Sequence, residues 1–154
     1  YYLTIMQVRF EDDIEFELHA DPDITGVPII KFILQPLVEN AVKYSHGRGK
    51  LAKIKITAKR QGQHVVLCVA DNGEGMSAEK TQEIMQEAMS QEAVHVLGGP
   101  VRRIGLRNVI ARCRLYYADR FHCEIETAEN EGTKISLWIP ISGGRADVQS
   151  VAGR

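Results

Sequence analysis

The chain has 154 residues, of which 44% are hydrophobic, so it can bury a core of its own and one compact domain is expected. Its 19 basic and 20 acidic side chains give a formal net charge of −1, so there is no global electrostatic reason to expect nucleic acid or an anionic membrane as partner. The three cysteines have no Cys-x-x-Cys spacing and the five histidines are scattered, which predicts reduced core thiols, a cytosolic compartment and no structural zinc site.

The first part of the chain predicts a strand followed by a long helix. Residues 1–10 have weak helical character and are expected to be the remnant of a linker helix. Residues 14–20 alternate apolar and polar side chains, which is typical of a half-buried strand. Apolar residues at helical spacing then predict a helix that has Pro28 in its first turn and Gly47 as its C-terminal cap. Pro36, inside this helix, is expected to kink it.

A hairpin and a second helix follow. Residues 51–59 and 64–70 predict two paired strands, and the second strand is nearly all apolar, so we expect it to lie nearer the centre of the sheet. Ser77 is expected to cap a helix over residues 78–89.

The last part of the chain predicts a loop, a helix and a hairpin. Residues 90–103 have no clear periodicity, and an irregular loop of this length inside a compact domain is commonly a functional lid. Helical spacing returns over residues 104–117. Residues 121–127 and 133–139 alternate like the two strands of a hairpin. We therefore expect one domain over residues 11–141, followed by a flexible tail over residues 142–154.

Three side chains on the long helix suggest chemistry. Asn40, Lys43 and Tyr44 lie at i, i+3 and i+4, so all three project from one side of the helix. An amide oxygen can ligate Mg²⁺, which usually shares its ligands with phosphates, and a lysine one turn further on can neutralise phosphate charge. The alternative is an ordinary amphipathic helix with a solvated face and a Glu39–Lys43 ion pair. This stretch alone leaves both interpretations open.

A glycine-rich turn, Asp-Asn-Gly-Glu-Gly-Met at residues 71–76, directly follows the apolar strand. A carboxylate at a strand end can accept a hydrogen bond from an exocyclic amine, and glycines let the backbone approach a flat ring. A dinucleotide fingerprint would need a third glycine and a later acidic residue, and an EF-hand would need oxygen ligands where Gly73 and Gly75 stand. A plain strand-to-helix turn remains the other interpretation.

The order of these motifs resembles the GHKL ATPase superfamily, and within it the catalytic ATP-binding domain of sensor histidine kinases. The matching order is an Asn-x-x-Lys-Tyr helix, a hairpin, Asp-x-Gly-x-Gly, an irregular lid, Ile-Gly-Leu at the start of a helix, and Glu-Gly-Thr in a final hairpin. Residues 34–41 and 104–112 look like the LytS/YesM-type branch. The resemblance implies an α/β Bergerat fold, in which helices cover one face of a mixed, mostly antiparallel sheet and nucleotide lies between helices and lid.

The resemblance also implies that ATP and Mg²⁺ are the cofactors and gives roles to residues of the long helix. Asn40 matches the family's magnesium-ligating asparagine. Lys43 and Tyr44 match positions near the phosphates and near the base or ribose. Glu39 is in a position either to order a magnesium-bound water or to pair with Lys43.

The adenine end of the implied site comes from the glycine-rich turn and the last hairpin. Asp71 matches the aspartate that hydrogen-bonds the adenine amine. Gly73 and Gly75 match the turn that admits adenine, and Met76 completes this motif. Thr133 matches the threonine that lies below the adenine pocket.

The second glycine motif departs from the family pattern. The family usually has Gly-x-Gly-Ile-Gly-Leu, whereas residues 101–106 are Val-Arg-Arg-Ile-Gly-Leu. Gly105 and Leu106 keep the end of the motif, where a helix N-terminus faces the phosphates. Arg103 either folds over the phosphates as an added cation or makes the lid too bulky to close. Pro36 stands where several hydrolysing relatives have an acidic base, which favours phosphotransfer over hydrolysis.

The resemblance implies a two-component sensor histidine kinase domain that transfers the ATP γ-phosphoryl group to a histidine on a separate dimerisation domain, and that does not autophosphorylate alone. The implied partners are this phosphoacceptor domain and a response regulator. The parent protein is expected to be a homodimer in the bacterial cell membrane, with this domain cytoplasmic and monomeric by itself. Three alternatives are a degenerate nucleotide-binding scaffold, an ATPase of the gyrase, chaperone or mismatch-repair type, and an α/β domain that binds no ligand.

Overall fold

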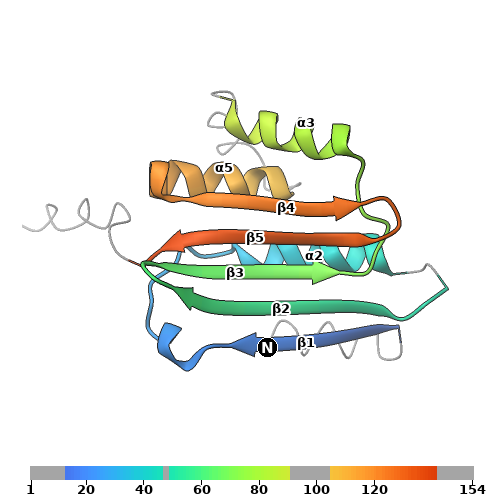
Figure 1. Cartoon of the computed structure of the whole chain (residues 1–154), viewed down its shortest axis with the longest axis horizontal. Helices are drawn as coiled ribbons and strands as arrows, with labels where there is room; N and C mark the ends of the chain where they lie inside the picture. Colours follow the sequence, from blue (N-terminus) through green and yellow to red (C-terminus); the bar gives the residue numbers. More distant parts are fainter. Residues whose placement is uncertain (1–12, 47–48, 91–104, 142–154) are drawn as a thin grey trace, which may run out of the picture.

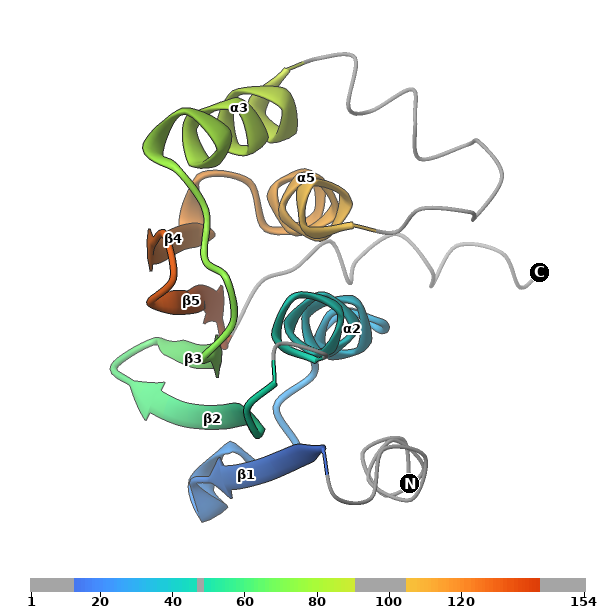
Figure 2. The same ribbon diagram turned by 90° about the vertical axis from the view of Figure 1, so that its right-hand side faces the viewer.

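The computed structural model describes residues 13–46, 49–90 and 105–141. These residues form one sheet with helices on a single face (Figures 1 and 2). The strands are β1 (Ile14–Ala20), β2 (Ala52–Gln61), β3 (His64–Asp71), β4 (His122–Ala128) and β5 (Gly132–Pro140). The helices are α2 (Leu34–Ser45), α3 (Ala78–Met89) and α5 (Leu106–Tyr117), with single 3₁₀ turns at Pro22–Ile24 and Ala118–Arg120. None of the helices in these described ranges is long and apolar enough to cross a membrane.

The five described strands lie in the order β1-β2-β3-β5-β4. The β1–β2 pair is parallel and the other three pairs are antiparallel. The nearly apolar strand β3 is central, as its sequence predicts. These features confirm the expected mixed, mostly antiparallel sheet with helices over one face. The register places Asp71, at the end of β3, opposite Thr133 on β5.

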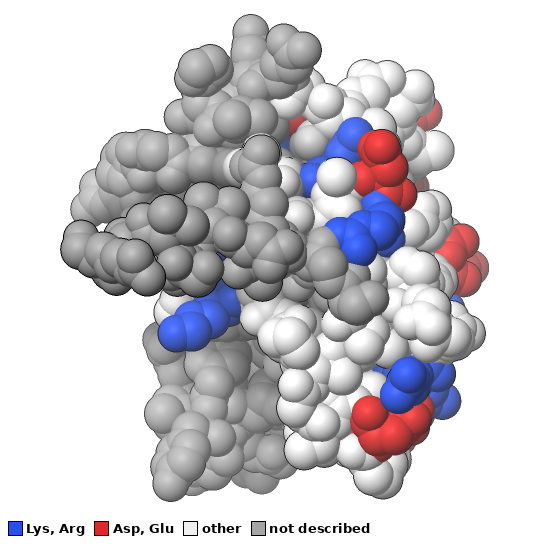
Figure 3. Space-filling model, turned by 90° about the vertical axis from the view of Figure 1, so that its left-hand side faces the viewer, with Lys and Arg blue, Asp and Glu red and all other residues white. Residues whose placement is uncertain are grey.

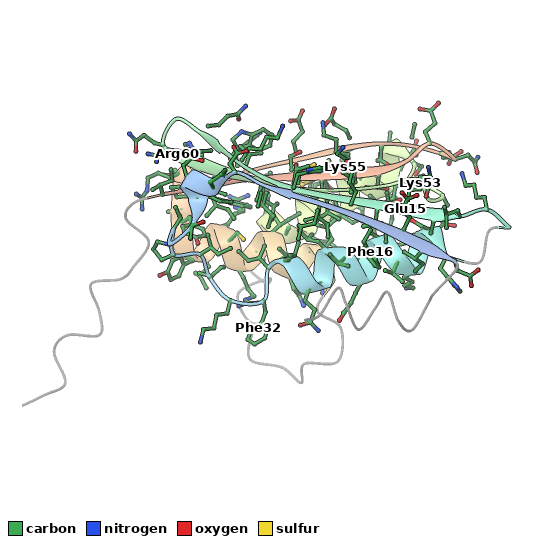
Figure 4. The ribbon with its side chains drawn as sticks, turned by 90° about the horizontal axis from the view of Figure 1, so that it is seen from below. Glu15, Phe16, Phe32, Lys53, Lys55 and Arg60 are labelled. Carbon is green, nitrogen blue, oxygen red and sulfur yellow. The ribbon has the colours of Figure 1, made fainter. Side chains whose placement is uncertain are left out.

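The two faces of the sheet follow from the alternation of side chains along each strand. Isoleucine, leucine and valine side chains of β2, β3 and β5 point to the helices and are buried with apolar residues of α2 and α5. On the opposite face, Lys53 lies 3.6 Å from Glu15 and Lys55 lies 2.8 Å from Glu17 (Figure 4). One face therefore forms the core, and the other face is solvated by charges of both signs.

Charges of both signs also lie together at one end of the molecule. Figure 3 shows blue Lys and Arg side chains next to red Asp and Glu side chains, with uncharged surface between these groups. The described part of this end has no patch of a single sign.

The helix α2 is shorter than its apolar spacing predicts. It begins at Leu34, so the expectation of a helix with Pro28 in its first turn was wrong. Phe32 has a φ of 62°, which a right-handed helix cannot include. Pro36 is therefore the third residue of the helix, where a backbone N–H would have no partner within the helix. The predicted interior kink was wrong for the same reason, because this proline removes no helical hydrogen bond.

The remaining elements agree with the sequence-based expectations. The Ser77 hydroxyl accepts a hydrogen bond from the backbone N–H of Lys80 and caps α3, which spans the residues predicted for it. The helix α5 begins directly after Gly105, and both predicted hairpins are present. The predictions for residues 1–10, for Gly47, for the lid from residue 91 onward and for the tail concern positions outside the described residues.

Candidate functional site

A cavity of about 580 Å³ lies between the inner face of the sheet and the three helices. Its volume is within the range of roughly 300 to 1,000 Å³ that is usual for small-molecule and cofactor sites. The sequence-predicted site residues that line the cavity are Asn40, Tyr44, Asp71, Gly75, Met76, Gly105, Leu106 and Thr133. These residues come from both halves of the chain, so the fold brings the two predicted glycine motifs together in one space.

Asp71 is the acidic group at the sheet side of the cavity. Burial raises the pKa of its carboxyl above the ordinary value, and this effect outweighs the lowering by the backbone N–H of Gly73, the Ser45 hydroxyl and the backbone of Thr133. The Gly73 N–H donates to Asp71 Oδ1 at 2.8 Å. The buried Ser45 hydroxyl also favours the charged form, although its geometry falls short of a hydrogen bond. A carboxylate has several acceptor sites, so capacity remains for a ligand that donates from the cavity.

The glycines of the 71–76 turn are required by close backbone contacts. A Cβ atom on Gly73 would lie 2.5 Å from the backbone oxygen of Tyr44 and 2.8 Å from Asp71 Oδ1. Gly75 has a φ of +66°, and a Cβ atom there would collide with the backbone carbonyl of Ala128. The turn therefore packs against the end of α2 on one side and the β4–β5 hairpin on the other, which only glycine allows.

Hydrogen bonds hold the same turn in place. The backbone N–H of Glu74 donates to the carbonyl of Tyr44 at 3.2 Å, and the Glu74 carbonyl accepts from the N–H of Asn130 at 2.6 Å. The N–H of Met76 donates to Thr127 Oγ1 at 2.9 Å. These hydrogen bonds fix the turn to α2 and to the β4–β5 hairpin. The Asp71 carboxylate at the start of the turn therefore has a defined position in the cavity.

The helix α2 presents a polar face to the cavity and its edge. Asn40 and Tyr44 line the cavity, whereas Lys43 and Glu39 are exposed and do not. The Lys43 Nζ atom lies 3.3 Å from the Tyr44 hydroxyl and 4.7 Å from the centre of the Tyr44 ring. Glu39 accepts a hydrogen bond from the Gln35 side chain at 2.9 Å. Lys43 and Glu39 thus lie outside the cavity lining, whereas Asn40 and Tyr44 form part of its wall.

The N-terminus of α5 forms the opposite wall. Gly105 is the N-cap residue and carries no side chain that could cap the helix, so among the described residues no N-cap side chain occupies the first backbone N–H groups. The positive end of the helix dipole lies at the same place, which makes it a favourable position for an anion. Arg103, the cation predicted for the phosphates, lies outside the described residues, so its role stays a prediction.

The cavity also contains polar residues that the sequence analysis did not assign to it. Lys80 and Glu87 reach it from α3, and Arg107 and Asn108 from the first turn of α5. Arg107 and Asn108 could have been found, because they follow Gly105 and Leu106 directly. Lys80 and Glu87 could not have been found, because the side of α3 that faces the cavity depends on how α3 packs against a helix later in the chain.

The amino-acid sequence of residues 27–143 matches the family described as histidine kinase-, DNA gyrase B-, and HSP90-like ATPase. The chain is also 31% identical over 148 residues to the sensor protein kinase HptS of Staphylococcus aureus. That match covers 96% of this chain and 27% of HptS, so the chain spans about a quarter of the length of the curated relatives it matches.

Solved structures of histidine kinases have the same fold. The nucleotide-free catalytic domain of ThkA superposes with a TM-score of 0.63 at 20% identity, covering 92% of this chain and 90% of that domain. The blue-light activated histidine kinase EL346 of Erythrobacter litoralis superposes with a TM-score of 0.58 at 15% identity, covering 92% of this chain and 41% of that protein. The predicted α/β architecture is confirmed by these likenesses. Because the family match extends over most of the chain, this protein belongs to the histidine kinase-, DNA gyrase B- and HSP90-like ATPases.

Proposed function

We propose that this chain is the catalytic domain of a sensor histidine kinase, which binds ATP with Mg²⁺ and presents the γ-phosphoryl group to a histidine on another domain. The observation that carries the proposal is that Asn40, Asp71 and the N-terminus of α5 border one cavity of about 580 Å³. Membership of the ATPase family and the resemblance to a sensor protein kinase support it.

The sheet side of the cavity fits an adenine ring. Asp71 offers a partly buried acceptor to an exocyclic amine, and a ligand that donates to this carboxylate would favour its charged form. Gly75 lines the cavity, and Thr133 lies opposite Asp71 on the neighbouring strand.

The helix side of the cavity fits the phosphates. The first turn of α5 offers backbone N–H groups and the positive end of its dipole. Asn40 would supply an amide oxygen to Mg²⁺. The described residues contain no group of three or more His, Cys, Asp and Glu side chains that could hold a metal, so phosphate oxygens and water would complete the coordination. Lys43, which lies outside the cavity lining, would reach a phosphate by rotating its flexible side chain away from Tyr44.

The chemistry is phosphoryl transfer, for which ATP supplies the transferred group and Mg²⁺ neutralises its charge. The protein contributes position and electrostatic stabilisation, since this reaction leaves little covalent work to side chains. The acceptor histidine, a dimerisation domain and a response regulator would be the partners. We also propose that the parent protein is a homodimer in the bacterial cell membrane and belongs to the LytS/YesM-type branch.

A degenerate nucleotide-binding scaffold is the second candidate. It is favoured by one feature of the sequence, the loss of two glycines from the second glycine motif, with Arg103 at one of the two positions. A scaffold would bind nucleotide or nothing, and would not phosphorylate an acceptor domain.

The test is calorimetric titration of the chain with ATP, with and without Mg²⁺, followed by phosphorylation of a supplied acceptor domain. We expect magnesium-dependent binding that Asn40→Ala abolishes, and adenine selectivity that Asp71→Asn abolishes. Gln82→Ala changes an exposed α3 residue outside the cavity lining, and this control is expected to bind like the wild type. Binding without phosphorylation would favour the scaffold, and no binding by the folded chain would reject the kinase.

A further inference from the structure

An ion pair joins two helices at the cavity. Arg107, in the first turn of α5, donates a hydrogen bond from Nη1 to Glu87 Oε2 of α3 at 2.9 Å. Both side chains line the cavity, together with Gly105 and Leu106. The side chains are 42% and 47% exposed, so water reaches the pair and either partner can leave it. The pair therefore lies at the entrance rather than in the core.

The position of Glu87 is unusual for a merely stabilising charge. It lies on Arg107, beside the N-terminus of a 12-residue helix, which is where a bound anion is favoured. Among the other ion pairs of the described residues, Lys80, which also lines the cavity, pairs with Glu83 of its own helix at 2.7 Å. The Lys55–Glu17 pair and the Lys134–Glu126 pair join neighbouring strands on the open face of the sheet. The Glu87 carboxylate therefore occupies a position, next to Arg107 and the N-terminus of α5, where a phosphate group would be favoured.

The guanidinium of Arg107 can bind a carboxylate or a phosphate with the same two-pronged geometry. A nucleotide phosphate at the start of α5 would meet both this guanidinium and the helix dipole, whereas Glu87 offers a single charge. Because an ion pair this exposed contributes little stability, its loss opposes binding only weakly. After the exchange, the Glu87 carboxylate has access to water.

We propose that Arg107 is a phosphate-binding residue of this site and that Glu87 is its internal counter-ion, which the nucleotide displaces. This inference rests on the proposed function, because it assigns regulation to the same nucleotide site. Glu87 then lowers the affinity for every phosphate-bearing ligand and has no effect on the nucleoside alone. In the absence of nucleotide, the ion pair between Glu87 and Arg107 also connects α3 to α5. Nucleotide binding breaks this connection between the two helices.

The test is titration of the chain with adenosine, ADP and ATP. Glu87→Gln keeps the size of the side chain and removes its charge, and it should tighten ATP and ADP about three-fold. Arg107→Gln should weaken both about ten-fold, as expected for the loss of a charge-assisted contact. The double variant should bind nearly like Arg107→Gln, because the Glu87 carboxylate contacts Arg107 directly and acts on Lys80, another cation of the cavity, only through space. None of these changes should alter adenosine binding. Glu126→Gln breaks an ion pair on the open face and is the matched control.

Three results would overturn the inference. If Glu87→Gln weakens ATP as Arg107→Gln does, the pair is a strut that shapes the cavity. If adenosine affinity changes with ATP affinity, the effect is not on the phosphates. If Glu87→Gln binds like the wild type while the wild type binds all three ligands, Glu87 does not compete and the proposed function stands without it. A folded wild-type chain that binds none of the ligands would reject the proposed function itself. Thermal unfolding of each variant confirms that it is folded.

Discussion

The carboxylate of Asp71 accepts a hydrogen bond of 2.8 Å from the backbone N–H of Gly73, while burial raises the pKa of the same carboxyl. The two effects oppose each other, and burial is the larger. The folded chain therefore holds a carboxylate in surroundings that disfavour its charge. Such a group costs stability at neutral pH and gains its advantage when a ligand donates a hydrogen bond to it, which is typical of binding sites.

The free energy of unfolding of Asp71→Asn, relative to that of the wild type, is expected to be higher at neutral pH than at acid pH. The pKa of Asp71 lies above 3.8 in the folded chain and near 3.8 in the unfolded chain, so the folded state binds the proton more tightly. The free energy of unfolding of the wild type therefore falls as pH rises through this window. Asparagine does not titrate. Urea unfolding at pH 7 and at about pH 3 should give a larger difference between variant and wild type at pH 7.

Gln82→Ala changes an exposed side chain that does not titrate and is the control for this comparison, so its difference from the wild type should be the same at both pH values. A pH-independent difference for Asp71→Asn would contradict the prediction.

Gly75→Ala is expected to destabilise the chain by roughly 3 to 4 kcal/mol, because it adds a left-handed alanine and a collision with the Ala128 carbonyl. Gly62→Ala is the matched control. Gly62 also has a positive φ, of +57°, but a Cβ atom there meets nothing within 4 Å, so only about 1 to 2 kcal/mol is expected. Chemical unfolding of both variants measures the difference, and equal losses would mean that the hairpin yields to the added methyl group.

Cys68 is expected to be the thiol that reacts rapidly in the folded chain. It is partly exposed on the open face of the sheet, where Thr57 and Ser136 are its neighbours on the adjacent strands. Burial raises the pKa of Cys113 and of Cys123 to about 12, so neither forms much of the reactive thiolate near pH 8.

A chromogenic disulfide reagent should therefore modify one thiol rapidly at pH 8, and all three in urea. Cys68→Ser should remove the rapid phase. Rapid reaction of that variant would show that β4 or α5 opens locally.

Ala118→Gly is expected to stabilise the chain by about 1 kcal/mol. Ala118 follows the last residue of α5 with φ 54° and ψ −137°, a conformation that costs energy for any residue with a Cβ atom. Its side chain is exposed, so glycine loses no packing there. The control Ala78→Gly, at the exposed start of α3, should lose up to about 1 kcal/mol. A loss in both variants, measured by urea unfolding, would contradict the prediction.

Local chemistry explains which parts of the fold could be predicted from the sequence. The strands and hairpins follow from alternation within a few residues, and the Ser77 cap from a contact three residues away. The start of α2 could not be predicted, because its cause lies far along the chain. The backbone N–H of Ile30 donates to the Tyr117 hydroxyl at 3.0 Å, and the Lys31 carbonyl accepts from Arg112 at 3.0 Å. These bonds to α5 hold the segment before Leu34 out of the helix that its apolar spacing favours.

The same distinction applies to the candidate site. Asn40 and Asp71 could be identified because each stands in a motif whose chemistry is complete within a few residues. Glu87 could not be identified, because its role depends on Arg107, twenty residues later, and on the packing of α3 against α5. That Lys43 and Glu39 lie outside the cavity lining could not be predicted either, since helical spacing shows which residues share a face of the helix but not where the cavity ends.

The place of β5 in the sheet has a consequence for biosynthesis. β5 is the last described strand along the chain, yet it lies between β3 and β4 and supplies Thr133 to the cavity. As the chain leaves the ribosome, α2 and Asp71 emerge well before β5 does. Until β5 is synthesised, β3 has an unpaired edge that can form non-native pairs with other strands. Nucleotide cannot assist folding during this interval, because the cavity that would hold it is completed only when β5 inserts. Chaperones that shield strand edges would therefore act on this domain during its synthesis, before ATP can stabilise it.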